Sequence, residues 1–461
     1  MSLIGALAFV FVLCAAVILH EFGHFIVAKL FGIRVETFSV GFGWRLFGFK
    51  YGTTDYRVSA IPLGGYVKLG GDESNAPIEG EGATDIPQHE RFDLRPRWQR
   101  ILVSVAGPVM NVLTALSIPF AGGLMYGIPA TPAPVVSAMM PGGAAQNAGL
   151  QPGDRIISFN GTQNPDWDTI SGEALLSPDQ SLPMVIDRNG QQIQLTIKPA
   201  AVTQEGETGG DLEFVPDYGN VAVVIDDVIP GSPAAEGGLQ GGDHILAIGG
   251  QPVKSREQVT QYIRSHKNEP IVMDVDRGGK TLPITSRVRP GEDLIGVHIS
   301  QKPPLERVGL IPVGRHAVAA NVQILRLTAK ALAQLFRGQR SARNTLSGPI
   351  GIYRVTSSAA VELGWAGVFS TLAFLSLNLG IVNLLPIPVL DGGAIFLLLI
   401  EGLLAIVGLT ISVNVRERIQ QVGFVLVVLI MLFAITNDLL KQTSIWRGSE
   451  SKPSATPTPA K

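Results

Sequence analysis

The chain has 461 residues, which is more than one domain usually holds and predicts two to four domains. Hydrophobic residues make up 46% of the sequence and charged residues only 16%, which favours a membrane protein with soluble parts over a purely soluble enzyme. The formal net charge of −2, without a basic stripe of interleaved aromatic residues, argues against nucleic acid as a partner. The single cysteine, Cys14, excludes an intrachain disulfide.

Residues 1–32 are predicted to form a membrane-spanning helix, since an apolar run leads into the pattern His20-Glu21-Phe22-Gly23-His24 and no signal-peptide cleavage site follows. On a helix the two histidines share one face and can bind Zn²⁺, while Glu21 can take a proton from water. Placing an ionisable side chain inside a membrane costs free energy, so the pattern favours a functional role for these residues. The alternative is that both histidines only satisfy hydrogen bonds at a helix interface.

Residues 33–71 are predicted to form a membrane-associated β-hairpin. Asp55–Ile61 alternates polar and apolar residues as a strand does, Pro62–Gly65 supplies a turn, and Tyr66–Leu69 returns. Before them, Ser39–Gly43 is an extended segment punctuated by glycine. Such backbone lies at membrane depth only where protein or a water-filled cavity covers it.

Residues 72–100 are predicted to form a cytoplasmic loop, which is acidic and rich in Gly and Pro before it becomes basic. A second membrane helix follows at 101–126, and its basic flank places the histidine pair near the cytoplasmic side. Asn111 lies inside this apolar helix and requires a hydrogen-bond partner, either from the protein or from a ligand.

Two copies of one soluble module are predicted at 133–200 and 220–300. Gly153-Asp154 recurs as Gly242-Asp243, and 242 − 153 = 89, the same offset that relates three other pairs of landmarks. Both copies resemble the core of PDZ domains, in which a peptide adds as a strand to a groove. The modules therefore either bind a peptide or protein ligand, or hold none and serve as spacers or size filters.

The remainder contains an amphipathic helix and turn at 313–350, a third membrane helix at 366–393, a helix and loop at 394–420, a fourth membrane helix at 421–440 and a disordered tail at 444–461. Whether 394–413 is a short helix or a further span is left open by the pattern. Asp391 follows the break in the third helix and is the expected third zinc ligand. Asn378 and Asn383 could bind substrate backbone or form ordinary interhelix hydrogen bonds.

Taken in order, five motifs resemble those of the site-2 protease family of intramembrane zinc metalloproteases. They are the HExxH pattern, Gly41-Phe42-Gly43, the segment Pro62–Lys68, Ser347-Gly348-Pro349-Ile350 and the segment Asn383–Gly393 that ends in Leu-Asp-Gly-Gly. The resemblance implies that His20, His24 and Asp391 bind zinc and that Glu21 is the general base. It also implies that the hairpin aligns substrate as a strand, with Gly41, Gly43, Ser59, Ile61, Gly64 and Gly65 as contact residues.

By this resemblance the fold is a polytopic α-helical membrane protein with about four spans, a membrane-associated β-hairpin and two periplasmic PDZ-like modules. It would lie in a bacterial inner membrane with its active site near the cytoplasmic side. The implied substrate is a single-pass transmembrane protein, such as an anti-sigma factor after a first cleavage, or a remnant signal peptide. The rival hypotheses are a membrane-anchored PDZ scaffold with a non-catalytic metal site and a metal transporter, but the ionisable residues cluster in one place.

Overall fold

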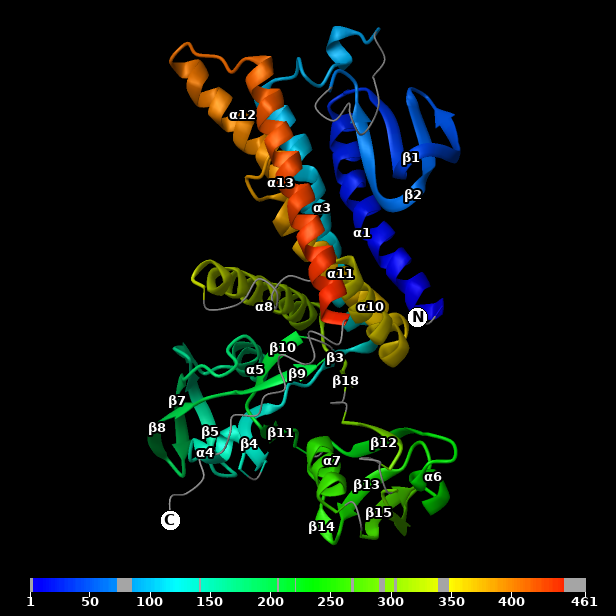
Figure 1. The fold of residues 1–461 in the computed structure, drawn as a ribbon, viewed down its shortest axis with the longest axis vertical. Coiled ribbons are helices and arrows are strands. Elements are labelled where there is room, and N and C mark those ends of the chain that lie inside the picture. The colour runs from blue at the N-terminus through cyan, green and yellow to red at the C-terminus, as the bar shows by residue number, and fades with distance from the viewer. Residues whose placement is uncertain are drawn as a thin grey trace. The chain divides into compact units, whose positions relative to one another are not determined.

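The computed structural model describes residues 3–72, 85–140, 142–204, 207–219, 221–266, 269–289, 295–301, 305–338 and 348–442 (Figure 1). The chain forms two compact units. The first contains the described residues of Met1–Met125, Leu310–Arg326 and Ala333–Lys461, and the second those of Tyr126–Gly309 and Leu327–Leu332. The predicted tail at 444–461, much of the loop at 72–100 and the turn before Gly348 lie outside the described residues.

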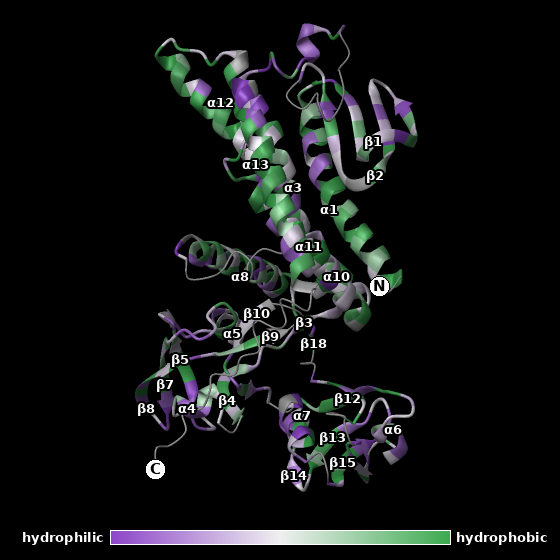
Figure 2. Ribbon diagram, in the orientation of Figure 1, coloured by the Kyte–Doolittle hydropathy of each residue, from purple (hydrophilic) through white to green (hydrophobic). Residues whose placement is uncertain are grey.

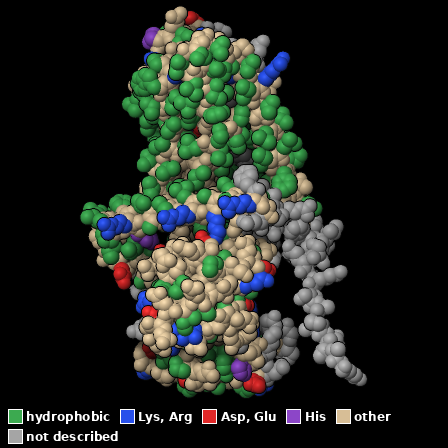
Figure 3. Space-filling view, turned by 90° about the vertical axis from the view of Figure 1, so that its left-hand side faces the viewer, with side chains coloured by type: hydrophobic (Ala, Val, Ile, Leu, Met, Phe, Trp, Pro, Cys, Tyr) green, Lys and Arg blue, Asp and Glu red, His purple; other side chains and the backbone are tan. Residues whose placement is uncertain are grey.

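Four helices in the described part of the chain are long and apolar enough to cross a membrane, as predicted. They are α1 (Leu3–Leu30), α3 (Arg97–Tyr126), α11 (Trp365–Asn383) and the segment Arg418–Leu440 of α13 (Val413–Gln442). Figure 2 shows hydrophobic residues along these helices, and Figure 3 shows hydrophobic side chains over the visible face of the first unit, which is called the helical unit below. α12 (Asp391–Ile406) has only 16 residues, so it favours the short-helix alternative for 394–413 over a fifth span.

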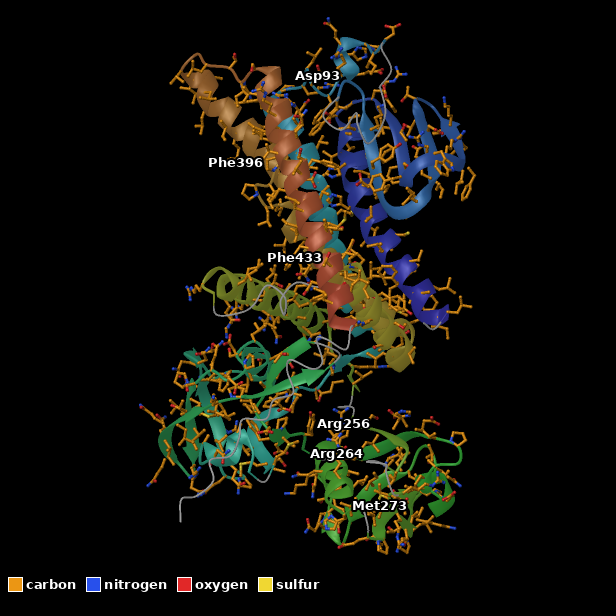
Figure 4. All side chains as sticks on the ribbon, viewed as in Figure 1. Asp93, Arg256, Arg264, Met273, Phe396 and Phe433 are labelled. Atoms are coloured by element: carbon orange, nitrogen blue, oxygen red, sulfur yellow. The ribbon has the colours of Figure 1, made fainter. Side chains whose placement is uncertain are left out.

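Small residues allow α1 to pack closely within the helical unit. Its Ala8, Val12 and Ala16 are buried in one cluster with Ala360 of α10 (Pro349–Leu363) and with residues of α11. By contrast, α12 and α13 carry large exposed side chains, among them Phe396 and Phe433 (Figure 4). On the span Arg418–Leu440 of α13, such exposed apolar side chains fit contact with lipid tails.

The strands β1 (Val35–Tyr51) and β2 (Thr54–Leu69) form a sheet beside α1 (Figure 1), but not with the predicted pairing. Phe38 pairs with Val67 on one side and with Tyr56 on the other, so Val35–Val40 lies between the two halves of β2. The predicted direct pairing of Asp55–Ile61 with Tyr66–Leu69 is therefore wrong. The reason is that Val35–Val40 itself alternates buried and half-buried residues and supplies the central strand.

The remaining elements lie in the first unit and in the connecting segments. They are η1 (Gln88–Glu90), α8 (Leu310–Phe336), whose Leu327–Leu332 belongs to the second unit, and the paired strands β3 (Ile128–Pro129) and β18 (Leu305–Glu306). α8 begins three residues before the predicted amphipathic segment 313–350, because Leu310, Ile311 and Pro312 already adopt helical conformation.

The second unit confirms the predicted repeat. The first module contains β4 (Ala133–Met139), α4 (Ala144–Asn147), β5 (Arg155–Phe159), β6 (Thr162–Gln163), α5 (Trp167–Leu175), β7 (Leu182–Arg188), β8 (Gln191–Ile197) and β11 (Phe214–Asp217). The second contains β12 (Val223–Val228), α6 (Pro233–Gly237), β13 (His244–Ile248), β14 (Gln251–Pro252), α7 (Arg256–Ser265), β15 (Ile271–Arg277), β16 (Lys280–Ser286) and β17 (Val297–Ser300). The strand orders β11-β4-β5-β7-β8 and β17-β12-β13-β15-β16 are equivalent.

Each module has its own hydrophobic core between its sheet and its helices. Met273 of β15 lies in the second core and is 1% exposed (Figure 4). The sheet of the first module extends past the predicted boundary at residue 200, because the buried Phe214 brings β11 beside β4. The intervening strands β9 (Ala200–Gln204) and β10 (Glu207–Asp211) form a separate hairpin.

The repeated glycine-aspartate motif holds an ion pair in each module. Asp154 accepts two hydrogen bonds from Arg188, and Asp243 accepts two from Arg277. The side chain of Asp243 is 1% exposed and also accepts a bond from the backbone amide of Gln240. The Arg277 guanidinium holds the pKa of Asp243 below its usual range, although burial opposes this shift.

We expect Asp243→Leu to destabilise the second module by about 3 kcal/mol, because it leaves the partly exposed Arg277 guanidinium and the amide of Gln240 without their acceptor. A carboxylate with a lowered folded pKa contributes stability above its unfolded pKa and loses it as the pH falls, so the difference from wild type should shrink in acid. Hydrogen exchange of the β13 and β15 amides in the full chain measures both effects. Glu236→Leu, which removes an exposed ion pair with Arg289, should cost less than about 1 kcal/mol; equal effects would contradict this account.

Candidate metal centre

Three side chains that are far apart in the sequence converge in the helical unit. His20 and His24 lie on one face of α1, and Asp391 is the first residue of α12. Nε2 of His20 lies 3.2 Å from Nε2 of His24 and 3.1 Å from Oδ2 of Asp391, while Nε2 of His24 lies 3.4 Å from Oδ1 of Asp391. The three potential ligand groups thus face a common point.

These spacings fit a tetrahedral zinc site. Ligand atoms about 2.0–2.1 Å from a zinc ion in tetrahedral geometry lie about 3.3 Å from each other, close to the three distances in this protein. Oδ2 of Asp391 is buried and accepts no hydrogen bond of ordinary geometry from the described part of the chain. Two imidazoles and one carboxylate, with a fourth position left over, are the donor set of a catalytic zinc rather than a structural one.

Two glycines after Asp391 allow α12 to begin where it does. A Cβ at Gly392 would lie 2.3 Å from the carbonyl oxygen of Leu384, and one at Gly393 would lie 2.2 Å from that of Ile387. The first turn of α12 is therefore packed directly against the break after α11. This packing explains why Asp-Gly-Gly, rather than Asp alone, sets the position of the carboxylate.

Residues on one face of the helix α3 contact both histidines. Nδ1 of His24 lies 2.8 Å from the carbonyl oxygen of Val103, and Nδ1 of His20 lies 3.1 Å from Nδ2 of Asn111. Between them, a Cβ at Gly107 would lie 2.3 Å from Nε2 of His24 and 2.7 Å from Cε1 of His20. The spacing of four residues puts Val103, Gly107 and Asn111 on one face of α3.

Glu21 lies between the histidines and the sheet. Its ionisable neighbours are His24, His20 and Asp391, and its carboxylate accepts a hydrogen bond from the backbone of Val67. A Cβ at Gly65 would lie 2.7 Å from the carbonyl oxygen of Ser39 and 3.5 Å from Cγ of Glu21. Glycine at this position thus lets β2 pair closely with β1, next to the side chain of Glu21.

The predicted substrate-contact residues fall into different environments. Nδ2 of Asn383 lies 3.1 Å from Nε2 of His20, so this amide is at the centre, whereas Asn378 donates to the carbonyl of Phe374 in its own helix. Ser59 is buried and shares a hydrogen bond with Ser39. Ile61 is 48% exposed.

Most of the glycines among the predicted substrate-contact residues have a backbone conformation that other residues rarely adopt. Gly41, Gly43 and Gly64 have positive φ angles of 89°, 87° and 128°, a region that favours glycine. At Gly41 a Cβ would also lie 2.6 Å from the carbonyl oxygen of Ile61. Gly41, Gly43 and Gly64 therefore have a structural role in the backbone of β1 and β2, whatever contacts they make with substrate.

Sequence reasoning missed the carbonyl of Val103 and the steric role of Gly107. A backbone acceptor has no side-chain signature, so nothing at position 103 could have shown it. Gly107 was visible as an interruption of an apolar helix, together with Pro108 and Asn111. Val103, Gly107 and Asn111 are spaced by four residues, and this spacing gives a signal only once the histidine pair is placed beside α3.

A helical membrane protein in which two histidines and an aspartate converge beside a glutamate has the arrangement of a membrane-embedded metalloprotease. Residues 8–430 match the family model described as peptidase family M50. The chain is 32% identical to the regulator of sigma-E protease RseP of Escherichia coli K12, over 94% of this chain and 97% of the relative.

Two further relatives are also 32% identical in sequence to this chain. The RseP of Salmonella typhimurium matches over 94% of this chain and 97% of its own length, and a candidate zinc metalloprotease of Vibrio cholerae matches over 94% and 98%. The chain belongs to peptidase family M50 and is an intramembrane metalloprotease of the site-2 type.

Proposed function

We propose that this metalloprotease hydrolyses a peptide bond within the membrane-spanning segment of a single-pass protein, with His20, His24 and Asp391 as zinc ligands and Glu21 as general base. The observation that carries the proposal is the convergence of these four groups from α1 and α12. When bound, zinc would polarise the peptide carbonyl and make water more acidic. Three protein ligands beside a glutamate favour this function over a scaffold with a structural zinc.

In the proposed reaction, Glu21 transfers protons and Asn383 positions the substrate. The Glu21 carboxylate takes a proton from the attacking water, whose oxygen bonds to the peptide carbon. When the carbon–nitrogen bond breaks, Glu21 returns the proton to the leaving amine nitrogen. The Asn383 amide, next to Nε2 of His20, is placed to donate a hydrogen bond to the substrate backbone.

A transmembrane helix must unwind before this attack, because its amides are bonded internally. Gly65–Leu69 of β2 lies beside Glu21, and in the register of the described residues it pairs on one side only, with Val35–Val40. An unwound substrate segment could add to the other side as a strand, which would replace its lost hydrogen bonds. This is the role we assign to the predicted contact residues of the sheet.

The similar proteins and the charged residues near α3 support a substrate class and an orientation of the chain in the membrane. Our proposed substrate is an anti-sigma factor after a first cleavage, with remnant signal peptides as a second class; two relatives named regulator of sigma-E protease support a role in sigma-E regulation. The arginines before α3 support a cytoplasmic position for the metal centre. On this topology the two modules face the periplasm of a bacterial inner membrane, where PDZ-like grooves bind peptide or exclude substrates with large folded parts.

Cleavage of a single-span substrate by the purified full chain in liposomes tests this proposal. Mass spectrometry should place the cut within the span. Because unwinding a helix costs roughly 1 kcal/mol less per glycine in place of a leucine-like residue, one Leu→Gly change near the cut should raise the rate about fivefold. A cut only outside the span, or a zinc-loaded chain that cleaves no tested span, would contradict the proposal.

A further inference from the structure

Asn111 is a buried polar side chain of α3 to which the proposed reaction gives no role. It is 0% exposed and lies inside a membrane-spanning helix, where an amide needs hydrogen-bond partners. Its Nδ2 contacts Nδ1 of His20, and its Oδ1 is buried without a partner among the described residues. An amide can turn by 180° and exchange these two atoms with almost no change of shape.

The tautomer of His20 decides which of the two amide atoms belongs beside the ring. A neutral imidazole that binds a metal through Nε2 carries its proton on Nδ1, and Nδ1 is then a donor that needs an acceptor. Nε2 of His20 is the nitrogen that faces His24 and Asp391. Therefore the amide oxygen, not the nitrogen, has to lie beside Nδ1.

His24 shows the same arrangement with a backbone group. Its Nδ1 lies 2.8 Å from the carbonyl oxygen of Val103, which can only accept, so its Nε2 also faces the centre as a free acceptor. The two ring contacts come from positions eight residues apart on α3, with Gly107 giving the room between them. α3 thus provides one acceptor for each histidine.

We infer that Asn111 is a positioning residue whose side-chain oxygen accepts the Nδ1 proton of His20 and so fixes the ring in its metal-binding tautomer. This inference rests on the proposed zinc site. Groups that hold a ligand histidine in this way typically change metal affinity by about 10- to 100-fold when removed. Asn111 does not touch the substrate in this role.

The test is the zinc dissociation constant of the full chain in detergent, measured by competition with a chelator. Asn111→Leu has similar size without an acceptor, and we expect zinc to bind about 10- to 100-fold more weakly. Asn111→Asp keeps an acceptor and should bind zinc as well as wild type. Asn321→Leu is the matched control, because Asn321 is also buried against α3 but donates to the carbonyl of Ala115, and its zinc affinity should not change.

Wild-type affinity in Asn111→Leu would overturn the inference, as would an equal loss in the Leu and Asp variants, since the amide would then act by donating or by packing. If Asn111→Leu does not fold, the Asp variant decides alone: a donating amide predicts loss of zinc there, and an accepting amide predicts retention. A wild-type chain that binds no zinc would instead overturn the proposed function. The two failures are therefore distinguishable.

Discussion

Replacement of Glu21 by Gln is expected to slow cleavage by about 10²- to 10⁴-fold, the usual contribution of a general acid–base group. The carboxylate lies beside His20, His24 and Asp391 without being one of the three converging ligand groups. An amide of the same shape preserves packing against Gly65 but cannot take a proton from water. The zinc content of the variant should therefore equal that of wild type.

The measurement pairs single-turnover cleavage of a single-span substrate with metal analysis of the same samples. Glu36→Gln is a suitable control, since Glu36 lies on β1 on the half-buried face of the strand, and its cleavage rate should stay close to wild type. Full activity of Glu21→Gln would remove this residue from the chemistry. Loss of zinc together with activity would make Glu21 a metal ligand instead of a base.

Gly107→Ala is expected to have the second large effect, although it adds a single methyl group. The new Cβ would lie 2.3 Å from Nε2 of His24, 2.6 Å from its Cε1 and 2.7 Å from Cε1 of His20. Real Cβ contacts are not this short, so α3 or both rings must move away from the ligand positions. Because ligand geometry is held tightly at a zinc site, we expect at least a 10-fold loss of zinc affinity and of cleavage.

Gly122→Ala is the matched control for this prediction. Gly122 lies in the same helix, and a Cβ there would meet no atom within 4 Å. The same substitution should therefore leave zinc affinity and cleavage unchanged. Equal behaviour of the two variants would show that the approach of α3 to the histidines is looser than the structure indicates.

The residues of the candidate centre were predictable from sequence because they are rare residue types in apolar segments. A carboxylate or imidazole inside an apolar run is costly, so His20, Glu21, His24 and Asp391 are conspicuous. The four apolar helices and the module repeat were predictable for similar reasons, since hydropathy and a constant offset are properties of the sequence itself. The structure brings His20, His24 and Asp391 together, as these patterns predicted.

What sequence could not predict depends on backbone position. Pairing of β1 and β2 was mispredicted because Asp55–Ile61 and Tyr66–Leu69 look like a local hairpin, whereas Val35–Val40 competes for both as a central strand. Likewise, the acceptor at Val103 is a carbonyl, and the need for glycine at 107 arises from contacts with His20 and His24 of a distant chain segment. Local patterns contain no information about such approaches.

Zinc content tests the central claim most directly. One zinc per chain is expected in the purified wild-type protein, removed by a chelator together with cleavage and restored with it, and each of His20→Ala, His24→Ala and Asp391→Ala should lose both. If any one of these three variants keeps zinc at wild-type stoichiometry and affinity, that residue is not a ligand. The convergence of α1 and α12 would then not be the metal centre of this protease.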